Sequence, residues 1–153
     1  MITLSTDSLK GYGLNRIFKF IKDAGYDGVD LFIDPKDYDT QDTAYVKSLA
    51  EEYSLPVVSL QTSPNATAKN IVEAVEMAKE LGAKIIIVQP PKLFNFKYIK
   101  WLTDEVPKIR QRESISIALE NAPSKTFLGI IPENAMNNLN ELRNFKHAAL
   151  DTT

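Results

Sequence analysis

Two acidic residues come directly after short apolar runs that have the composition of buried strands. Glu120 and Asn121 follow Ile115–Leu119, and Asp151 follows Ala148–Leu150. A carboxylate at the end of a buried strand needs a partner, because burying the charge alone is costly. Neighbouring strands lie about 4.8 Å apart, so two such acids could share one divalent cation. The structural alternative is that either acid caps a helix or forms a salt bridge in a loop.

Further polar residues recur where other strands are expected to end. They are Asp34, Gln61 and Gln89. Polar groups that converge from many strand ends are typical of the catalytic face of a (β/α) barrel. Asp30, placed near the end of the second predicted strand, could contact a substrate, although an orienting or salt-bridge role explains it equally well.

Six β-rich runs recur along the chain. They are Ile2–Ser5, Gly28–Ile33, Val57–Leu60, Lys84–Val88, Ile115–Leu119 and Ala148–Leu150. Successive runs start roughly 25 to 35 residues apart, which is the length of one strand, one helix and two loops. The run Ile85–Val88 is apolar on both faces, as expected for a parallel strand buried between two layers.

Five helices are predicted in the gaps by apolar residues at helical spacing. These residues lie at 14–21, 45–53, 71–81, 98–106 and 139–142. Gly25 and Gly82 are expected to cap the C-terminal ends of the first and third helices. Pro107 should kink or end the fourth helix. Pro132 should open the fifth as its first residue.

The alternation of strands and helices leaves two architectures, a doubly wound open sheet or a barrel. No glycine-rich phosphate loop follows the first strand, and the polar strand ends favour a barrel. We therefore expect residues 1–153 to form one α/β domain, an incomplete (β/α)8 TIM barrel truncated on its C-terminal side. About six parallel strands in sequential order and five helices are expected. The open barrel edges should promote self-association.

The whole chain resembles the xylose isomerase-like TIM barrel superfamily, which includes sugar isomerases, ketose 3-epimerases and endonuclease IV. The matching segments are Ala24–Leu31, Leu81–Val88, Ala118–Asn121 and Leu150–Thr152. The resemblance implies that Glu120 and Asp151 bind a divalent metal, Mn²⁺, Mg²⁺, Co²⁺ or Zn²⁺. It also implies that Glu120 is the catalytic acid/base. We expect the substrate to be contacted by Asp30, Gln61, Gln89 and Asn121.

The expected function is that of a metal-dependent sugar or sugar-phosphate isomerase or epimerase, present here as its N-terminal part. The family completes its metal site with a histidine and an acid from later strands, so this chain alone is expected to be inactive. Its one histidine, His147, precedes the sixth strand and should lie at the opposite end of the barrel. The alternatives are an endonuclease IV-like AP endonuclease and a non-catalytic truncated barrel. Endonuclease IV has histidines where this sequence has Gln61 and Gln89, and glutamine is a poor zinc-cluster ligand.

The amino-acid composition limits which binding partners and which cellular location are expected. The 153 residues carry a formal charge of −2, which argues against a nucleic-acid partner because phosphate binding usually leaves a basic surface. The absence of cysteine excludes disulfides and thiolate metal sites and fits a reducing compartment. No signal peptide is visible, and the apolar stretches are shorter than the roughly 20 residues that span a bilayer. We therefore expect a cytoplasmic protein with a small sugar ligand and no membrane partner.

Overall fold

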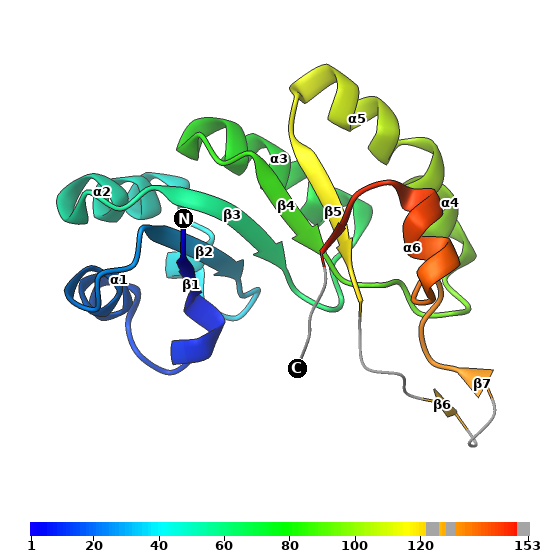
Figure 1. Ribbon diagram of the computed structural model, residues 1–153, viewed down its shortest axis with the longest axis horizontal. Coiled ribbons are helices and arrows are strands. Elements are labelled where there is room, and N and C mark those ends of the chain that lie inside the picture. The colour runs from blue at the N-terminus through cyan, green and yellow to red at the C-terminus, as the bar shows by residue number, and fades with distance from the viewer. Residues whose placement is uncertain (122–125, 128–130, 150–153) are drawn as a thin grey trace.

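A computed structural model describes residues 1–121, 126–127 and 131–149. Six strands form one sheet in the order β1-β2-β3-β4-β5-β8, with every neighbouring pair parallel. The strands are β1 (Thr3–Ser5), β2 (Gly28–Ile33), β3 (Val57–Thr62), β4 (Ile85–Val88), β5 (Ser116–Glu120) and β8 (Ala148–Ala149). This sequential order excludes the doubly wound sheet and confirms an incomplete (β/α) barrel. Figure 1 shows the strands following one another across the molecule.

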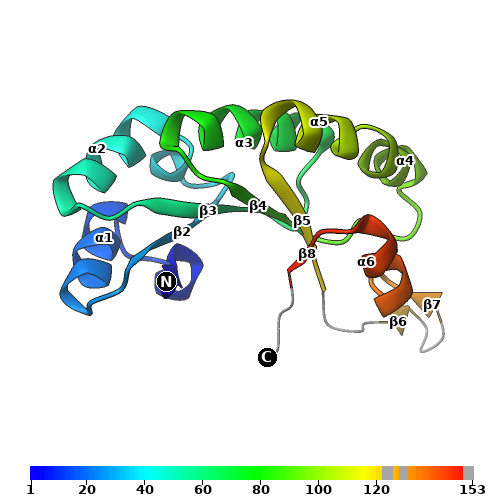
Figure 2. The same ribbon diagram turned by 45° about the horizontal axis from the view of Figure 1, so that its top comes forward.

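The helices alternate with the strands along the chain. They are α1 (Leu14–Asp23), α2 (Thr43–Tyr53), α3 (Ala68–Leu81), α4 (Phe96–Asp104), α5 (Val106–Glu113) and α6 (Leu139–Phe145). Two short 3-10 helices, η1 (Thr6–Leu9) and η2 (Tyr38–Thr40), follow β1 and β2. Figure 2 shows the sheet as an arch, with α2, α3 and α5 along its convex side. None of the helices described is long and apolar enough to cross a membrane.

Both predicted glycine caps are confirmed, and two predicted features differ. Gly25 and Gly82 have positive φ angles, +79° and +74°, at the ends of α1 and α3. The fifth predicted helix does not open at Pro132. That residue ends β7 (Ile131–Pro132), which pairs antiparallel with β6 (Thr126–Phe127) outside the main sheet. The helix α6 begins instead after Asn138, where a capping box satisfies its first backbone N–H groups.

The second difference concerns Pro107, which was expected only to kink or end a helix. The helix α4 does end at Asp104, but a further helix, α5, starts at Val106 with Pro107 in its first turn. A proline is tolerated there because the first turn needs no backbone N–H donor. Sequence patterning missed α5 because only Val106 and Ile109 of this helix are buried.

The two faces of the sheet have different roles. In register across β2 to β5, Leu31, Leu60, Ile86 and Ile117 form one row and are fully buried. This row belongs to the same core cluster as apolar residues of the helices, among them Phe18, Ile71 and Leu102. Since side chains alternate between faces, the intervening residues line the concave side. On that side Ile85 remains 39% exposed.

Candidate functional site

The concave side of the sheet carries polar residues in successive rows. The pairing of β1 to β5 places Ser5, Asp30, Ser59, Ile85 and Ser116 in one row across the sheet. Two residues further along, Phe32, Gln61, Ile87 and Ala118 form a second row. Another two residues along, Gln89 and Glu120 lie at the carboxyl ends of their strands. The first of these rows is therefore mainly polar, the second is mainly apolar, and polar side chains return at the C-terminal end of the strands.

Gln61, Gln89 and Glu120 meet at the C-terminal end of the sheet. Gln61 Nε2 donates a hydrogen bond to Glu120 Oε2 over 3.3 Å, and Gln89 Nε2 donates to the same oxygen. The strand β4 lies between β3 and β5, so Gln61 reaches over one strand, a span of about 9.6 Å. All three side chains are half-buried. Two amides from neighbouring strands thus fix the orientation of one carboxylate.

Asp30 lies apart from this cluster. It is the third residue of β2, in the middle of the strand and not near its end. Ser59 Oγ donates a 2.6 Å hydrogen bond to Asp30 Oδ1. Burial raises the pKa of the Asp30 carboxyl, against the smaller lowering effect of hydrogen bonds from Ser59 and Ser5. The same row ends on β5 at Ser116, four residues or about 13 Å before Glu120 along the strand.

The remaining predicted site residues are Asn121, which directly follows β5, and Asp151. The backbone N–H of Asn121 donates to the Ala149 carbonyl over 3.2 Å, directly beyond the pairing of Glu120 with Ala149. The structure therefore places Asn121 next to the cluster in sequence and beside β8. Asp151, the second predicted metal ligand, lies outside the described residues.

The donor set of the cluster suits a hard cation. Glu120 supplies a carboxylate, and Gln61 and Gln89 supply amides, whose carbonyl oxygens are ligands that Mg²⁺ and Mn²⁺ accept. Within the described ranges, no group of three or more His, Cys, Asp or Glu side chains could hold a metal ion. Glu120 fits the role of one ligand in such a site.

His147 lies toward the other end of the sheet, as the sequence predicted. Its Nδ1 is 2.7 Å from Ser116 Oγ, and Ser116 is the first residue of β5, whereas Glu120 is the last. Desolvation, with a smaller contribution from the charge of Arg110, lowers the pKa of His147. The contact with Ser116 gives His147 a partner away from Glu120.

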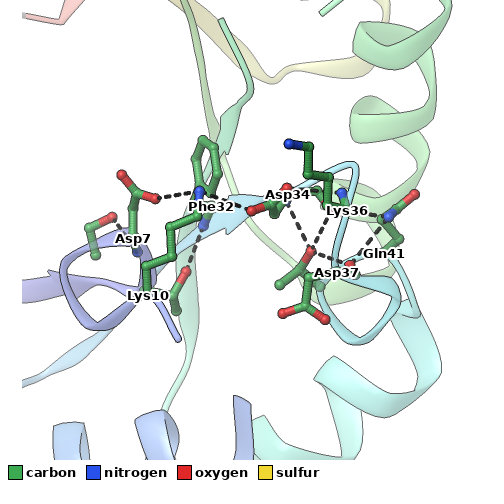
Figure 3. A network of polar contacts seen from close by, with 10 residues as sticks. Asp7, Lys10, Phe32, Asp34, Lys36, Asp37 and Gln41 are labelled. Atoms are coloured by element: carbon green, nitrogen blue, oxygen red, sulfur yellow. Dashed lines mark hydrogen bonds and ion pairs between the residues drawn. The ribbon is translucent and has the colours of Figure 1, made fainter. Parts of the chain in front are cut away.

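Asp34 has a structural role. Its Oδ2 forms a 3.0 Å ion pair with Lys10, and its Oδ1 accepts a 2.9 Å hydrogen bond from the Lys36 backbone N–H. Both interactions lower the pKa of Asp34, the Lys36 N–H having the larger effect. Lys10 also lies over the Phe32 ring, 5.2 Å from its centroid. Figure 3 shows how this network ties the segment after β1 to the loop after β2.

A second connection at the same end of the sheet was missed by sequence reasoning. The backbone N–H of Leu93 donates to the Glu133 carbonyl over 3.0 Å, and that of Ala135 donates to the Pro91 carbonyl over 2.9 Å. Lys92 Nζ lies 2.6 Å from Glu133 Oε1. These contacts join the loop after β4 to the segment that follows β7. They link positions some 40 residues apart, so no local sequence pattern predicts them.

Comparison with known sequences finds relatives without an established activity. No protein-family model matches the sequence. An uncharacterized protein from Mycobacterium leprae is 30% identical over 129 residues, which are 78% of this chain and 46% of the relative. An uncharacterized protein from Mycobacterium tuberculosis is 27% identical with the same coverage. The chain therefore spans about half the length of the curated relatives it matches.

Comparison with solved structures identifies the fold. A 3-keto-D-glucoside 4-epimerase from E. coli aligns with a TM-score of 0.65 and 19% identity, covering 92% of this chain and 64% of the epimerase. A xylose isomerase domain protein from Alicyclobacillus acidocaldarius gives 0.61 and 14%, covering 97% and 61%. The IolI protein, with a bound zinc atom, gives 0.57 and 20%, covering 78% and 51%. At such low identities the likeness concerns the fold. The described strands and helices of this chain thus have the fold of part of a TIM barrel.

Proposed function

We propose that this chain is the N-terminal part of a metal-dependent sugar or sugar-phosphate isomerase or epimerase. One observation carries the proposal. Glu120, at the carboxyl end of β5, is held by the amides of Gln61 and Gln89 from the two preceding strands. The carboxyl ends of barrel strands are where TIM-barrel enzymes place their catalytic groups. An epimerase and a zinc-containing protein among the proteins of the same fold add support.

In this proposal each residue has a defined role. Glu120 and Asp151 hold a divalent cation, Mn²⁺, Mg²⁺, Co²⁺ or Zn²⁺, and Glu120 also takes a proton from a substrate carbon and returns one. Gln61 and Gln89 orient the Glu120 carboxylate and present amides to substrate hydroxyls. Asn121 and Asp30 are proposed as further substrate contacts. Asp30 would meet only a substrate that extends toward the middle of the concave side.

The chemistry depends mainly on where the carboxylate points. When bound, the cation would polarise a carbonyl and a neighbouring hydroxyl of the sugar. Glu120 then acts as the general base for the C–H next to that carbonyl. Two neutral amides fix the carboxylate without adding a positive charge beside it. A fixed base lowers the entropic part of the barrier because the reacting atoms start in position.

We also propose a cytoplasmic location, which the cysteine-free composition fits. The endonuclease IV-like alternative gains no support from the described strand ends, because Gln61 and Gln89 stand at the two strand ends where that enzyme class has histidines, and His147 contacts Ser116. The non-catalytic alternative predicts neither metal nor sugar binding at Glu120.

The proposal is tested by asking whether a sugar and a metal ion bind next to each other at Glu120. Ketoses and ketose phosphates are titrated into the chain with Mn²⁺, and their ¹³C NMR signals are followed. Mn²⁺ is paramagnetic, so carbons held beside it broaden. We expect broadening of the carbonyl carbon and its neighbours with the wild-type chain and its loss in Glu120→Gln. Glu51→Gln, an exposed position on α2, is the matched control and should behave as wild type. Broadening that persists in Glu120→Gln would contradict the proposal.

A further inference from the structure

A pocket of about 430 Å³ lies between the loop after β3 and the loop after β4. Its walls include Pro64, Asn65, Pro91, Lys97, Tyr98 and Trp101. Its volume is in the range of small-molecule pockets, roughly 300–1,000 Å³. Both loops follow the carboxyl ends of their strands, so the pocket opens at the same end of the sheet as Glu120.

The chain itself limits how far this pocket can be from the Glu120 cluster. Pro91 comes two residues after Gln89, so their Cα atoms are at most about 7.6 Å apart. Pro64 comes three residues after Gln61, which sets a limit of about 11.4 Å. Two walls of the pocket therefore start within one or two sugar-ring lengths of the Cα atoms of Gln89 and Gln61, whose amides hold Glu120.

The lining suits a partly apolar, hydroxyl-bearing group. Tyr98 and Trp101 lie one turn apart on α4, with ring centroids 6.2 Å apart and ring planes within 10°. Both residues are half-buried and line the pocket, so part of each side chain remains available to a ligand. The exposed amide of Asn65 can both donate and accept hydrogen bonds, as hydroxyl groups require. An aromatic surface beside an amide offers contacts to both the C–H face and the hydroxyls of a pyranose ring.

The charges in the pocket do not favour a phosphate. Lys92, which also lines it, is paired with Glu133 at 2.6 Å. The side chains of Thr67 and Asn95 already accept hydrogen bonds from backbone N–H groups at the starts of α3 and α4. Among the described lining residues, Lys97 is the one cation without an ion pair. A single exposed lysine is weak recognition for a dianion and sufficient for a hydroxyl.

We propose that this pocket binds a second, non-reacting sugar ring, so that the substrate is a glycoside and not a single monosaccharide. The inference rests on the proposed function, because it assigns the reacting ring to the Glu120 cluster. Tyr98 and Trp101 contact the apolar face of the second ring. Asn65 and Lys97 bind its hydroxyls.

Trp101 is the sole tryptophan of the chain, so intrinsic fluorescence reports directly on the pocket. The chain is titrated with cellobiose and maltose, and separately with glucose and inorganic phosphate. We expect a saturable change with a disaccharide, a weaker response with glucose and none with phosphate. Tyr98→Leu and Asn65→Ala should each lower the affinity by roughly tenfold. Asn65 is exposed, so its replacement tests the pocket even if Tyr98→Leu impairs folding.

Two controls separate this inference from the proposed function. Phe94→Ala removes an exposed aromatic ring that does not line this pocket and should leave the affinity unchanged. The fluorescence change on disaccharide binding requires no metal. It should therefore persist in the Glu120→Gln variant, even when the Mn²⁺ broadening of ketose signals is lost in that variant. No saturable response to either disaccharide, or an affinity unchanged in Asn65→Ala, would overturn the proposal. A phosphate response that competes with the disaccharide would overturn it too, by assigning an anion site.

Discussion

Three acids that the sequence predicted at or near strand ends have three different environments in the structure. Asp34 is paired with Lys10, Asp30 is half-buried and accepts a hydrogen bond from Ser59, and Glu120 is held by two amides. The sequence placed each of them on or after an apolar run but did not distinguish their roles. The reason is physical, because each partner comes from a different strand or loop. Asp34 and Lys10 are 24 residues apart, and Gln61 and Glu120 are 59 apart.

Asp30 should make stability depend on pH. Burial raises the pKa of its carboxyl above the ordinary value of 3.8, so the folded state binds its proton more tightly than the unfolded state does. The stability that the folded state gains from proton binding at Asp30 is therefore fully present below pH 3.8, and it is lost as pH rises through the raised pKa. Asp30→Asn, which is neutral and can still accept the Ser59 hydrogen bond, removes this loss. The free energy of unfolding of Asp30→Asn minus that of wild type should therefore be larger at about pH 7 than at about pH 4.

Urea denaturation at the two pH values measures this effect. Asp23→Asn on the exposed side of α1 serves as the control for the loss of one negative charge. If the Asp30→Asn variant loses stability relative to wild type as pH rises, the burial argument for Asp30 is wrong.

At the scale of elements, the sequence predicted those whose patterns are local. The strand Gly28–Ile33 has the predicted bounds, and α1 and α3 end one or two residues before their predicted glycines. The small β6–β7 pair and the start of α6 were not predicted. Each β6–β7 strand has two residues, too few to show an alternating pattern. Pro132 satisfies the rule for a first helical residue, but the Asn138 capping box gives the helix a start that also satisfies its N–H groups.

Gly28 has a packing role that should be measurable. A Cβ atom at this position would lie 2.7 Å from Val58 Cγ2 and 2.8 Å from the Pro56 carbonyl oxygen, where β2 enters the sheet beside β3. Gly28→Ala should therefore lower the free energy of unfolding by about 1–3 kcal/mol, the usual cost of overpacking. Gly13→Ala is the comparison, since a Cβ there meets nothing within 4 Å. It should cost about 1 kcal/mol or less, for the weaker helix cap. Equal losses in thermal denaturation would refute the close-contact explanation.

At the scale of the whole molecule, the described sheet is open along one side. The strands β1 and β8 form its two edges, and the concave side exposes Ile85 while Phe32 and Ile87 are half-buried. Unpaired edges and apolar surface favour association. We expect light scattering after size exclusion to give a mass above that of one chain, rising with concentration. Ile85→Lys should shift the population toward monomer, whereas Val72→Lys on α3 should not. A single monomeric species at all concentrations would contradict this expectation.

The central claim is that Glu120 is a metal ligand, and calorimetry with Mn²⁺ tests it most directly. The wild-type chain should show weak but saturable binding, because the described residues include no group of three or more His, Cys, Asp or Glu side chains that could hold the ion. Glu120→Gln keeps the size of the side chain and removes its charge, so the affinity should fall by at least about tenfold. Glu51→Gln on α2 should bind Mn²⁺ as wild type does. Equal Mn²⁺ affinity in the Glu120→Gln and wild-type chains would contradict the account.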